Sequence, residues 1–291
     1  MTATTILMKH TFREMTLRDA NKAYAKVRAM IGLSETAGTW FTEPNANVKF
    51  THTLERFTYG LSLMPAQSGR AFCLDNGFDA AAAALNKFNV CPHSTPMCRE
   101  GCLATAGKGM FDNTKAGRTA RTLLWAVDPD AAYTLTCHHI RRVVRKHGAE
   151  NVAIRLNTLS DIMWERVLPP VFWVEFSAVQ FYDYTKAWGQ FDRRALLPEN
   201  YHLTVSASER MSVAAVAEAV ACNVNVAVVI DQHPDAPKPA TWYGMPVVDG
   251  NATDARYLDP QGGHVVLLGA LGKAKALPVG EREFVKPSRV A

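Results

Sequence analysis

The spacing of apolar and polar residues predicts an amphipathic helix near the beginning of the chain. Over residues 16–31 apolar side chains recur every three or four positions, which places them on one face of a helix. Thr16 is a typical N-cap residue, with Asp19 three positions later. Two β-prone runs and an alanine-rich helical segment follow, at residues 48–51, 57–63 and 79–88.

A regular alternation of strands and helices begins at residue 128. Asp128 and Pro129 are the expected N-cap and first residue of a helix that stops at Gly148. Apolar runs predict strands over residues 152–156, 178–182, 201–205, 224–230, 245–248 and 264–268. Helices are predicted between some of these strands, over residues 162–167 and 212–222. This alternation is typical of βαβ units and a parallel sheet. We therefore predict an α/β fold, a full or partial (β/α) barrel with a mostly parallel sheet.

The predicted barrel-like domain spans residues 57–275, with a helical and β extension over 1–56 packed on it and a C-terminal tail over 276–291. The chain has 291 residues, 48% hydrophobic and 20% charged, which favours a globular protein over a disordered one. No run approaches the roughly 18 apolar residues of a membrane span, and no secretory leader is recognisable. We expect a cytoplasmic protein without a membrane partner.

Half of the chain's six cysteines lie on one loop, as Cys91, Cys98 and Cys102 in a C-x6-C-x3-C spacing. Two prolines and a glycine between them favour a backbone that folds back on itself. In a reducing compartment, clustered thiols are more typical of metal ligands than of disulfides. The other cysteines are isolated and are expected to be small buried side chains: Cys73, Cys137 and Cys222.

Two kinds of metal centre are compatible with three thiolates. Structural zinc normally takes four ligands, and His93, His138 or His139 would supply the fourth. Three cysteines without an obvious fourth ligand suit a [4Fe–4S] cluster in which one iron stays open to a ligand. We predict a [4Fe–4S] cluster held by the three loop cysteines, with zinc as the alternative metal.

Polar side chains follow the predicted strands at their carboxyl ends, where functional groups gather in parallel α/β sheets. Asp161, Lys186 and Tyr182 are the predicted catalytic residues. Asp161 would accept a hydrogen bond from a ribose or an amine, and Lys186 would neutralise a carboxylate or phosphate. The alternative is that these polar residues are only helix caps or turn residues. The predicted cofactor-binding residues are Arg155, Asn157, Ser206, Asp231 and Arg256.

The segment after residue 247 admits two interpretations. Asp249 and Gly250 indicate a turn, and Asp254 and Arg256 follow it. A solvent-exposed pair of opposite charges is common and contributes little stability. If the neighbouring strands end the sheet, Asp254 and Arg256 would instead cap the pocket and orient a charged ligand, with Lys273 nearby.

A basic cluster lies on the predicted helix over residues 129–147. The net charge of +5 and the pI of about 8.9 permit a phosphate-bearing partner without requiring one. The cluster is either a solvated helix face or a contact surface for nucleic acid. Its members are Arg141, Arg142, Arg145 and Lys146.

Several blocks of the sequence resemble a family of bacteriophage proteins with a cysteine-rich loop, which look like distant relatives of radical S-adenosylmethionine enzymes. The blocks are residues 61–66, 91–103, 155–161 and 181–186. The resemblance implies a partial (β/α) barrel, a [4Fe–4S] cluster on Cys91, Cys98 and Cys102, and S-adenosylmethionine on the open iron. The superfamily's usual spacing is C-x3-C-x2-C, and its glycine-glycine-glutamate motif is not recognisable here, so the cluster is better supported than S-adenosylmethionine.

The predicted function is that of a phage-type iron–sulfur protein, a radical S-adenosylmethionine-like enzyme that modifies a small molecule, a nucleotide or a nucleic acid. Its location would be the host cytoplasm. One alternative is a phage binding or regulatory protein in which a metal only staples the loop and the basic helix contacts nucleic acid or a host protein. Another is a base transglycosylase-like barrel, with Asp161 or Asp231 as the nucleophile.

Overall fold

The computed structural model describes residues 2–34, 39–44, 56–65, 67–105, 107–187 and 197–288. They belong to two compact units, each built from several segments of the chain. The first unit comprises Met1–Pro92, Lys108–Phe181 and Leu196–Tyr201, and the second comprises His93–Gly107, Tyr182–Ala195 and His202–Ala291. The predicted strand at 48–51 lies outside the described residues.

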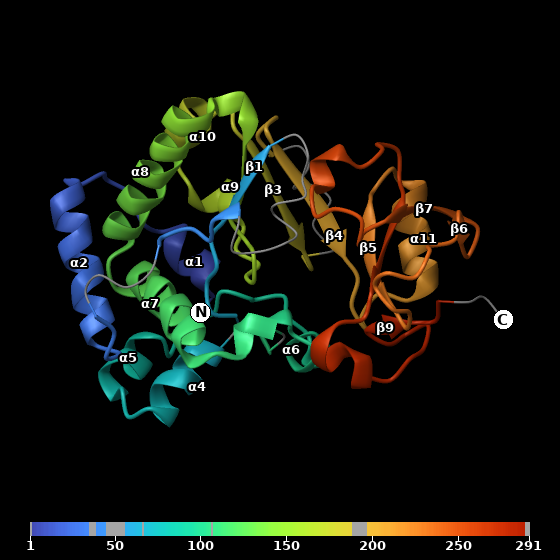
Figure 1. Ribbon diagram of the computed structural model, residues 1–291, viewed down its shortest axis with the longest axis horizontal. Coiled ribbons are helices and arrows are strands. Elements are labelled where there is room, and N and C mark those ends of the chain that lie inside the picture. The colour runs from blue at the N-terminus through green and yellow to red at the C-terminus, as the bar shows by residue number, and fades with distance from the viewer. Residues whose placement is uncertain are drawn as a thin grey trace. The chain divides into compact units, whose positions relative to one another are not determined.

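Three long helices pack against one another in the first unit (Figure 1): α2 (Leu17–Ala29), α7 (Asp112–Val127) and α8 (Pro129–His147). The predicted helix starts are confirmed, because Thr16 accepts from the backbone N–H of Asp19 and Asp128 accepts from that of Ala131. Helix α8 ends at Gly148, whose φ of +83° is one that side-chain-bearing residues rarely adopt. The capping signals in the sequence therefore set the limits of α2 and α8.

Shorter elements complete the first unit. Strand β1 (Phe57–Gly60) pairs in parallel with β2 (Val152–Arg155), which pairs in parallel with the start of β3 (Gln180–Thr185). The helices are α1 (Ala3–Leu7), α4 (Ser68–Asp75), α5 (Asp79–Ala84), α9 (Trp164–Val167) and α10 (Pro170–Glu175). The aromatic residues around α9 and α10 are buried core: Trp164, Phe172, Trp173 and Phe176.

The second unit contains most of the predicted later strands. Strands β4 (Tyr201–Ser206), β5 (Val226–Ile230), β8 (Val265–Gly269) and β7 (Met245–Asp249) are neighbours in that order and run parallel. Helix α11 (Val213–Ala221) packs on them through a valine-rich core. Two short strands complete this sheet: β6 (Thr241–Trp242) is antiparallel to β7, and β9 (Val285–Lys286) is parallel to the last residues of β5.

The α/β class and the mostly parallel sheet of the prediction are confirmed, whereas the barrel is not. The order of the nine strands, β1-β2-β3-β4-β5-β8-β7-β6 with β9 beside β5, is a path that does not return to its start within the described part of the chain. A barrel requires its first and last strands to pair. The fold is therefore an open α/β sheet.

None of the helices described here is long and apolar enough to cross a membrane.

Candidate functional site

The cysteine loop is organised around a short helix, α6 (Pro96–Glu100). Thr95 is 1% exposed, and its hydroxyl caps α6 by accepting from the backbone N–H of Cys98 at 3.2 Å. Pro96 occupies the first helical position, where its lack of an N–H costs nothing. Cys98 therefore lies on α6, and Cys102 follows two residues after the helix ends.

One carboxylate holds this loop in the second unit. Glu209 follows β4 by three residues and accepts two hydrogen bonds, from Thr95 Oγ1 at 2.6 Å and from the backbone N–H of Met97 at 3.0 Å. Burial raises the pKa of Glu209, but the hydrogen bonds from Thr95, from its own backbone N–H and from Met97, together with the charge of Lys186, hold the pKa below its usual value. We call Thr95, Met97 and Glu209 the loop clamp.

The opposite side of the loop is apolar. A Cβ atom on Gly101 would lie 2.9 Å from Leu277 Cδ1, so only glycine allows this approach without a shift of Leu277. The side chains of Met97 and Cys98 pack against a small core cluster made of Ala270, Ala274, Leu277, Phe284 and Val285. Most of this cluster follows β8 in the chain, so the loop contacts segments that leave β4 and β8 at their carboxyl ends.

Two lysines complete the charge pattern beside the clamp. Lys186 follows β3, and its Nζ donates to Ser206 Oγ at 2.6 Å and lies 5.3 Å from the ring centroid of Phe284. Lys286 is fully buried and donates to the backbone carbonyls of Glu281 and Glu283. Burial lowers the pKa of Lys286 to about 8, against the opposing effect of the Glu283, Glu209 and Glu281 carboxylates.

The loop clamp therefore lies at the edge of a parallel sheet where ligands usually bind. Strands β4, β5 and β8 run parallel, so their carboxyl ends share one edge. In open α/β sheets this edge is the general ligand site. Lys186, Ser206 and Glu209 all follow or end strands on this side, with the loop of Cys98 against them. This edge is the candidate functional site.

Cys91 belongs to the first unit, whereas Cys98 and Cys102 belong to the second. The thiol of Cys91 is 8% exposed and donates to the carbonyl of Leu159 at 3.3 Å. The preceding residue, Val90, accepts from the backbone N–H of Asp161 at 2.8 Å, which ties the start of the loop to the predicted catalytic aspartate. Within the described ranges no group of three or more His, Cys, Asp or Glu side chains is placed to hold a metal ion.

The isolated cysteines divide into two kinds. Cys73 and Cys137 are fully buried as predicted, and burial raises the pKa of Cys73 to about 11 and that of Cys137 to about 12. The prediction of a buried Cys222 is wrong, because this residue is the exposed C-cap of α11. The buried residues of α11 lie on its apolar face, and Cys222 follows the last helical residue, so its side chain stays exposed.

The other predicted site residues are distributed between the two units. In the first unit, Asn157 is buried and its side chain bonds to Ser160, Ile162 and Trp164, which favours a structural role for this amide. Arg155 ends β2. In the second unit, Tyr182 is fully buried with its ring 5.3 Å from that of Tyr257, and Asp231 is exposed after β5. Their roles in ligand binding or catalysis stay predictions.

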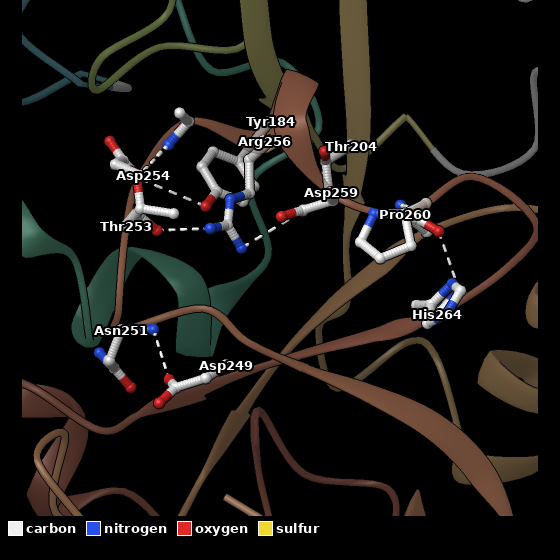
Figure 2. Close-up of polar contacts among 12 residues, drawn as sticks. Tyr184, Thr204, Asp249, Asn251, Thr253, Asp254, Arg256, Asp259, Pro260 and His264 are labelled. Carbon is white, nitrogen blue, oxygen red and sulfur yellow. Dashed lines mark hydrogen bonds and ion pairs between the residues drawn. The ribbon is translucent and has the colours of Figure 1, made fainter. Parts of the chain in front are cut away.

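Arg256 lies in a second polar group of the second unit, shown in Figure 2. Its guanidinium donates to the carbonyl of Thr253 and lies 3.4 Å from Asp259 Oδ2, while Tyr184 Oη donates to Asp254 Oδ1 at 3.3 Å. Burial raises the pKa of Asp259 to about 6 although Arg256 opposes this. We call this group the buried arginine cluster; its members are Tyr184, His202, Asp254, Arg256 and Asp259.

The interpretation of Asp254 and Arg256 as a solvent-exposed pair is wrong. Arg256 is 0% exposed and Asp254 is 5% exposed. The reason is that Arg256 begins a 3-10 turn (Arg256–Leu258) and is the buried residue of that turn. Burial also lowers the pKa of His202 to about 4, and the charge of Arg256 lowers it further. Lys273, the expected neighbour, is exposed on another turn, Gly272–Ala276.

Three of the residues that matter most here are not among the predicted site residues. The position of Glu209 after a predicted strand is the one feature of the sequence that suggests a functional role for it. Nothing in its neighbourhood in the sequence indicates that it bonds to residues more than a hundred positions earlier. Lys286 lies in the predicted tail, and Asp259 looks like an ordinary turn residue before Pro260. Their importance comes from tertiary burial.

Residues 46–281 match the family described as Gene product 88, which is more than half of the chain. The chain belongs to the gene product 88 family. No curated protein and no solved structure matches it. The gene product 88 match agrees with the phage-type family that the sequence blocks resemble, and it does not extend to radical S-adenosylmethionine enzymes. The matched region includes the cysteine loop, the loop clamp and the buried arginine cluster, whereas Lys286 lies outside it.

Proposed function

We propose that this gene product 88 protein is an iron–sulfur enzyme of the radical S-adenosylmethionine type, in which Cys91, Cys98 and Cys102 hold a [4Fe–4S] cluster. The observation that carries the proposal is the loop clamp. It fixes a loop with two of the three thiols at the carboxyl edge of a parallel sheet. A metal ion with a purely structural role would not require its loop to lie at the edge of the sheet where ligands bind.

The chemistry of the loop thiols supports such a cluster. All three thiols are free of disulfides, and Cys98 and Cys102 are partly exposed rather than sealed in the core. The apolar cluster against Cys98 would limit water around its sulfur, a property that tunes metal centres. When bound, the cluster would supply single electrons for radical chemistry.

The chain's own residues would bind and orient the substrate. Lys186 now donates to Ser206, and an incoming carboxylate or phosphate would replace that hydroxyl as the acceptor of a charge-assisted hydrogen bond. Glu209 repels the same anion, so it would direct the ligand toward Lys186 while it keeps the loop in place. The substrate class is therefore a small anionic molecule or a nucleotide.

Anaerobic reconstitution with iron and sulfide tests the cluster. We expect about four irons per chain, a brown colour and loss of both in Cys98→Ser. Cys222→Ser is the matched control, because it removes an exposed thiol outside the loop and should keep the iron. One equivalent of zinc without iron in the reconstituted protein would overturn the proposal.

The reaction has its own test. With an intact cluster, a reductant and S-adenosylmethionine, we expect release of 5′-deoxyadenosine. In Lys186→Met this release should fall at least ten-fold, because the ammonium that would bind the anionic group is gone. An intact cluster without any 5′-deoxyadenosine would reject the radical reaction while leaving the iron–sulfur site standing.

A structural zinc site is the second candidate, and His93 favours it. His93 Nε2 is buried and has no hydrogen-bond partner in the described part of the chain, and this residue lies on the cysteine loop. A buried imidazole nitrogen without a partner is a suitable fourth ligand for zinc. His93→Ala separates the candidates: zinc affinity should fall at least ten-fold in a Cys3His site, whereas iron content should stay unchanged in a three-cysteine cluster.

A further inference from the structure

The basic helix α8 is less free than its sequence indicates. Arg141 donates to both oxygens of Glu14 at 2.7 Å and to both of Glu175, from Nε at 2.5 Å and from Nη2 at 2.8 Å. The two carboxylates use four of the five N–H donors of this guanidinium, so it has little capacity left for a phosphate. Arg141 is therefore a structural link between α8 and its neighbours in the first unit.

The end of α8 carries an aromatic stack instead. The ring of Phe57 lies on that of His147, with centroids 3.9 Å apart and an angle of 24° between the planes. His147 Nε2 is 2.9 Å from Tyr59 Oη, a contact that fixes the imidazole, and Asn151 donates to the backbone carbonyl of His147. Phe57 is nevertheless 48% exposed, so the stack is open to solvent.

Exposed cations lie on the same end of α8 as this stack. Arg145 and Lys146 are exposed in the last turn of α8, directly before His147. Arg142 lies 3.7 Å from Glu43, but both side chains are half exposed, so this ion pair is weak and easily exchanged for a phosphate. Burial lowers the pKa of His147, helped by Lys146, so the ring is neutral at pH 7 and adds a flat apolar surface rather than a charge.

We infer that Phe57 and His147, with Arg142, Arg145 and Lys146, form a binding surface for single-stranded nucleic acid. The exposed face of Phe57 would stack a base, and the cations would contact the flanking phosphates. This combination of an aromatic platform and a basic track is how proteins bind single strands with little sequence preference. A duplex keeps its bases stacked on one another and has none to offer to Phe57. The surface lies within the first unit and does not depend on the proposed chemistry.

The test is fluorescence anisotropy of the full chain with a labelled 12-nucleotide oligothymidylate and with a 12-base-pair duplex, over a series of salt concentrations. We expect tighter binding of the single strand. Phe57→Ala should weaken it roughly five-fold or more with an unchanged salt slope, and Phe57→Trp should restore it. Arg145→Gln with Lys146→Gln should lower the slope of log K against log salt by about one to two.

The matched control is Lys22→Gln with Lys26→Gln. It removes the same charge from exposed positions of α2, on the side away from that helix's buried residues, and should bind like the wild type. Equal losses in the two double variants would show binding driven by net charge alone and would overturn the inference. Preference for the duplex, or wild-type affinity in Phe57→Ala, would overturn it as well.

Discussion

The loop clamp and the buried arginine cluster are both polar groups of the second unit, and they differ in what their charges contact. Glu209 of the clamp bonds to a loop from another part of the chain and is offset by a partly exposed lysine. Arg256 of the cluster is 0% exposed and is offset by Asp259, three residues away on the same turn. Arg256 is among the site residues predicted from the sequence, whereas Glu209 is not.

The difference teaches that charge at a strand end does not by itself mark a ligand site. A sealed ion pair is costly to desolvate, so its removal shows up in the stability of the fold. A carboxylate that positions a loop beside a partly open edge affects the loop and whatever that loop binds. Substitutions in the two groups should therefore separate stability from metal binding.

The largest effect is expected for Arg256→Met. Removal of the guanidinium leaves the Asp259 carboxylate buried without a counter-charge, which typically costs about 3–5 kcal/mol. Arg256→Lys should cost less but still lower the melting temperature, since an ammonium cannot reproduce the planar contacts to Thr253 and Asp259. Urea denaturation measures both, with the exposed Arg282→Met as control. Wild-type stability in Arg256→Met would show that the cluster is not structural.

The next effect is a pH dependence that comes from Asp259. Its folded pKa, about 6, lies above its ordinary 3.8, so the folded state holds a proton that the unfolded state has released. The wild type should therefore lose stability relative to Asp259→Asn as pH rises from about 4 through 6, by roughly 3 kcal/mol, and the difference should be constant above pH 7. Denaturation curves at pH 4, 5, 6 and 7 measure this. The exposed Asp235→Asn should show no such trend.

The clamp should respond differently. Glu209→Ala leaves the Met97 N–H without its acceptor, and the loss of hydrogen bonds to a charged group costs about 1–3 kcal/mol, confined to the loop. Iron content after reconstitution should fall at least two-fold in Glu209→Ala and by a smaller factor in Glu209→Gln, while the midpoint of global unfolding changes little.

The clamp should also depend on pH. Because the pKa of Glu209 is lowered from 4.5, the clamp is fully formed above that pH and weakens as the pH falls further. Glu218→Gln on the exposed face of α11 is the control for the loss of one carboxylate. Normal iron content in Glu209→Ala would show that the loop clamp has no role in metal binding.

Local signals in the sequence were sufficient for the elements of the regular part of the fold. The caps Thr16 and Asp128 and the stop at Gly148 agree with the structure, and so do the valine-rich runs that became β5 and β8. Helix α7 was missed because threonines and Gly117 interrupt its apolar face, so its covering by α2, α4 and α8 is what makes it a helix. Closure into a barrel depends on pairing between distant strands, which no local pattern contains.

The candidate site could be predicted only in part. The spacing of the three cysteines identified the loop, and polar strand ends identified Lys186 and Ser206, which do contact each other. The partner of the loop is Glu209, and that contact spans more than a hundred residues. Whether Arg256 faces solvent or the interior depends on what packs over it, and a single sequence does not reveal this.

The smallest effect is expected for Tyr184→Phe, and it sharpens the comparison most. This variant removes only the hydroxyl that donates to Asp254 Oδ1 at 3.3 Å, so the expected loss is about 0.5–1.5 kcal/mol. Tyr243→Phe removes a comparable hydroxyl contact to Glu281 at the surface and should change stability by less than about 0.5 kcal/mol. Iron content should be normal in both variants, because neither hydroxyl belongs to the loop clamp. A Tyr184→Phe protein that folds with wild-type stability and yet loses iron would join the two groups into one site, and the division between a sealed structural cluster and a functional edge would then be wrong.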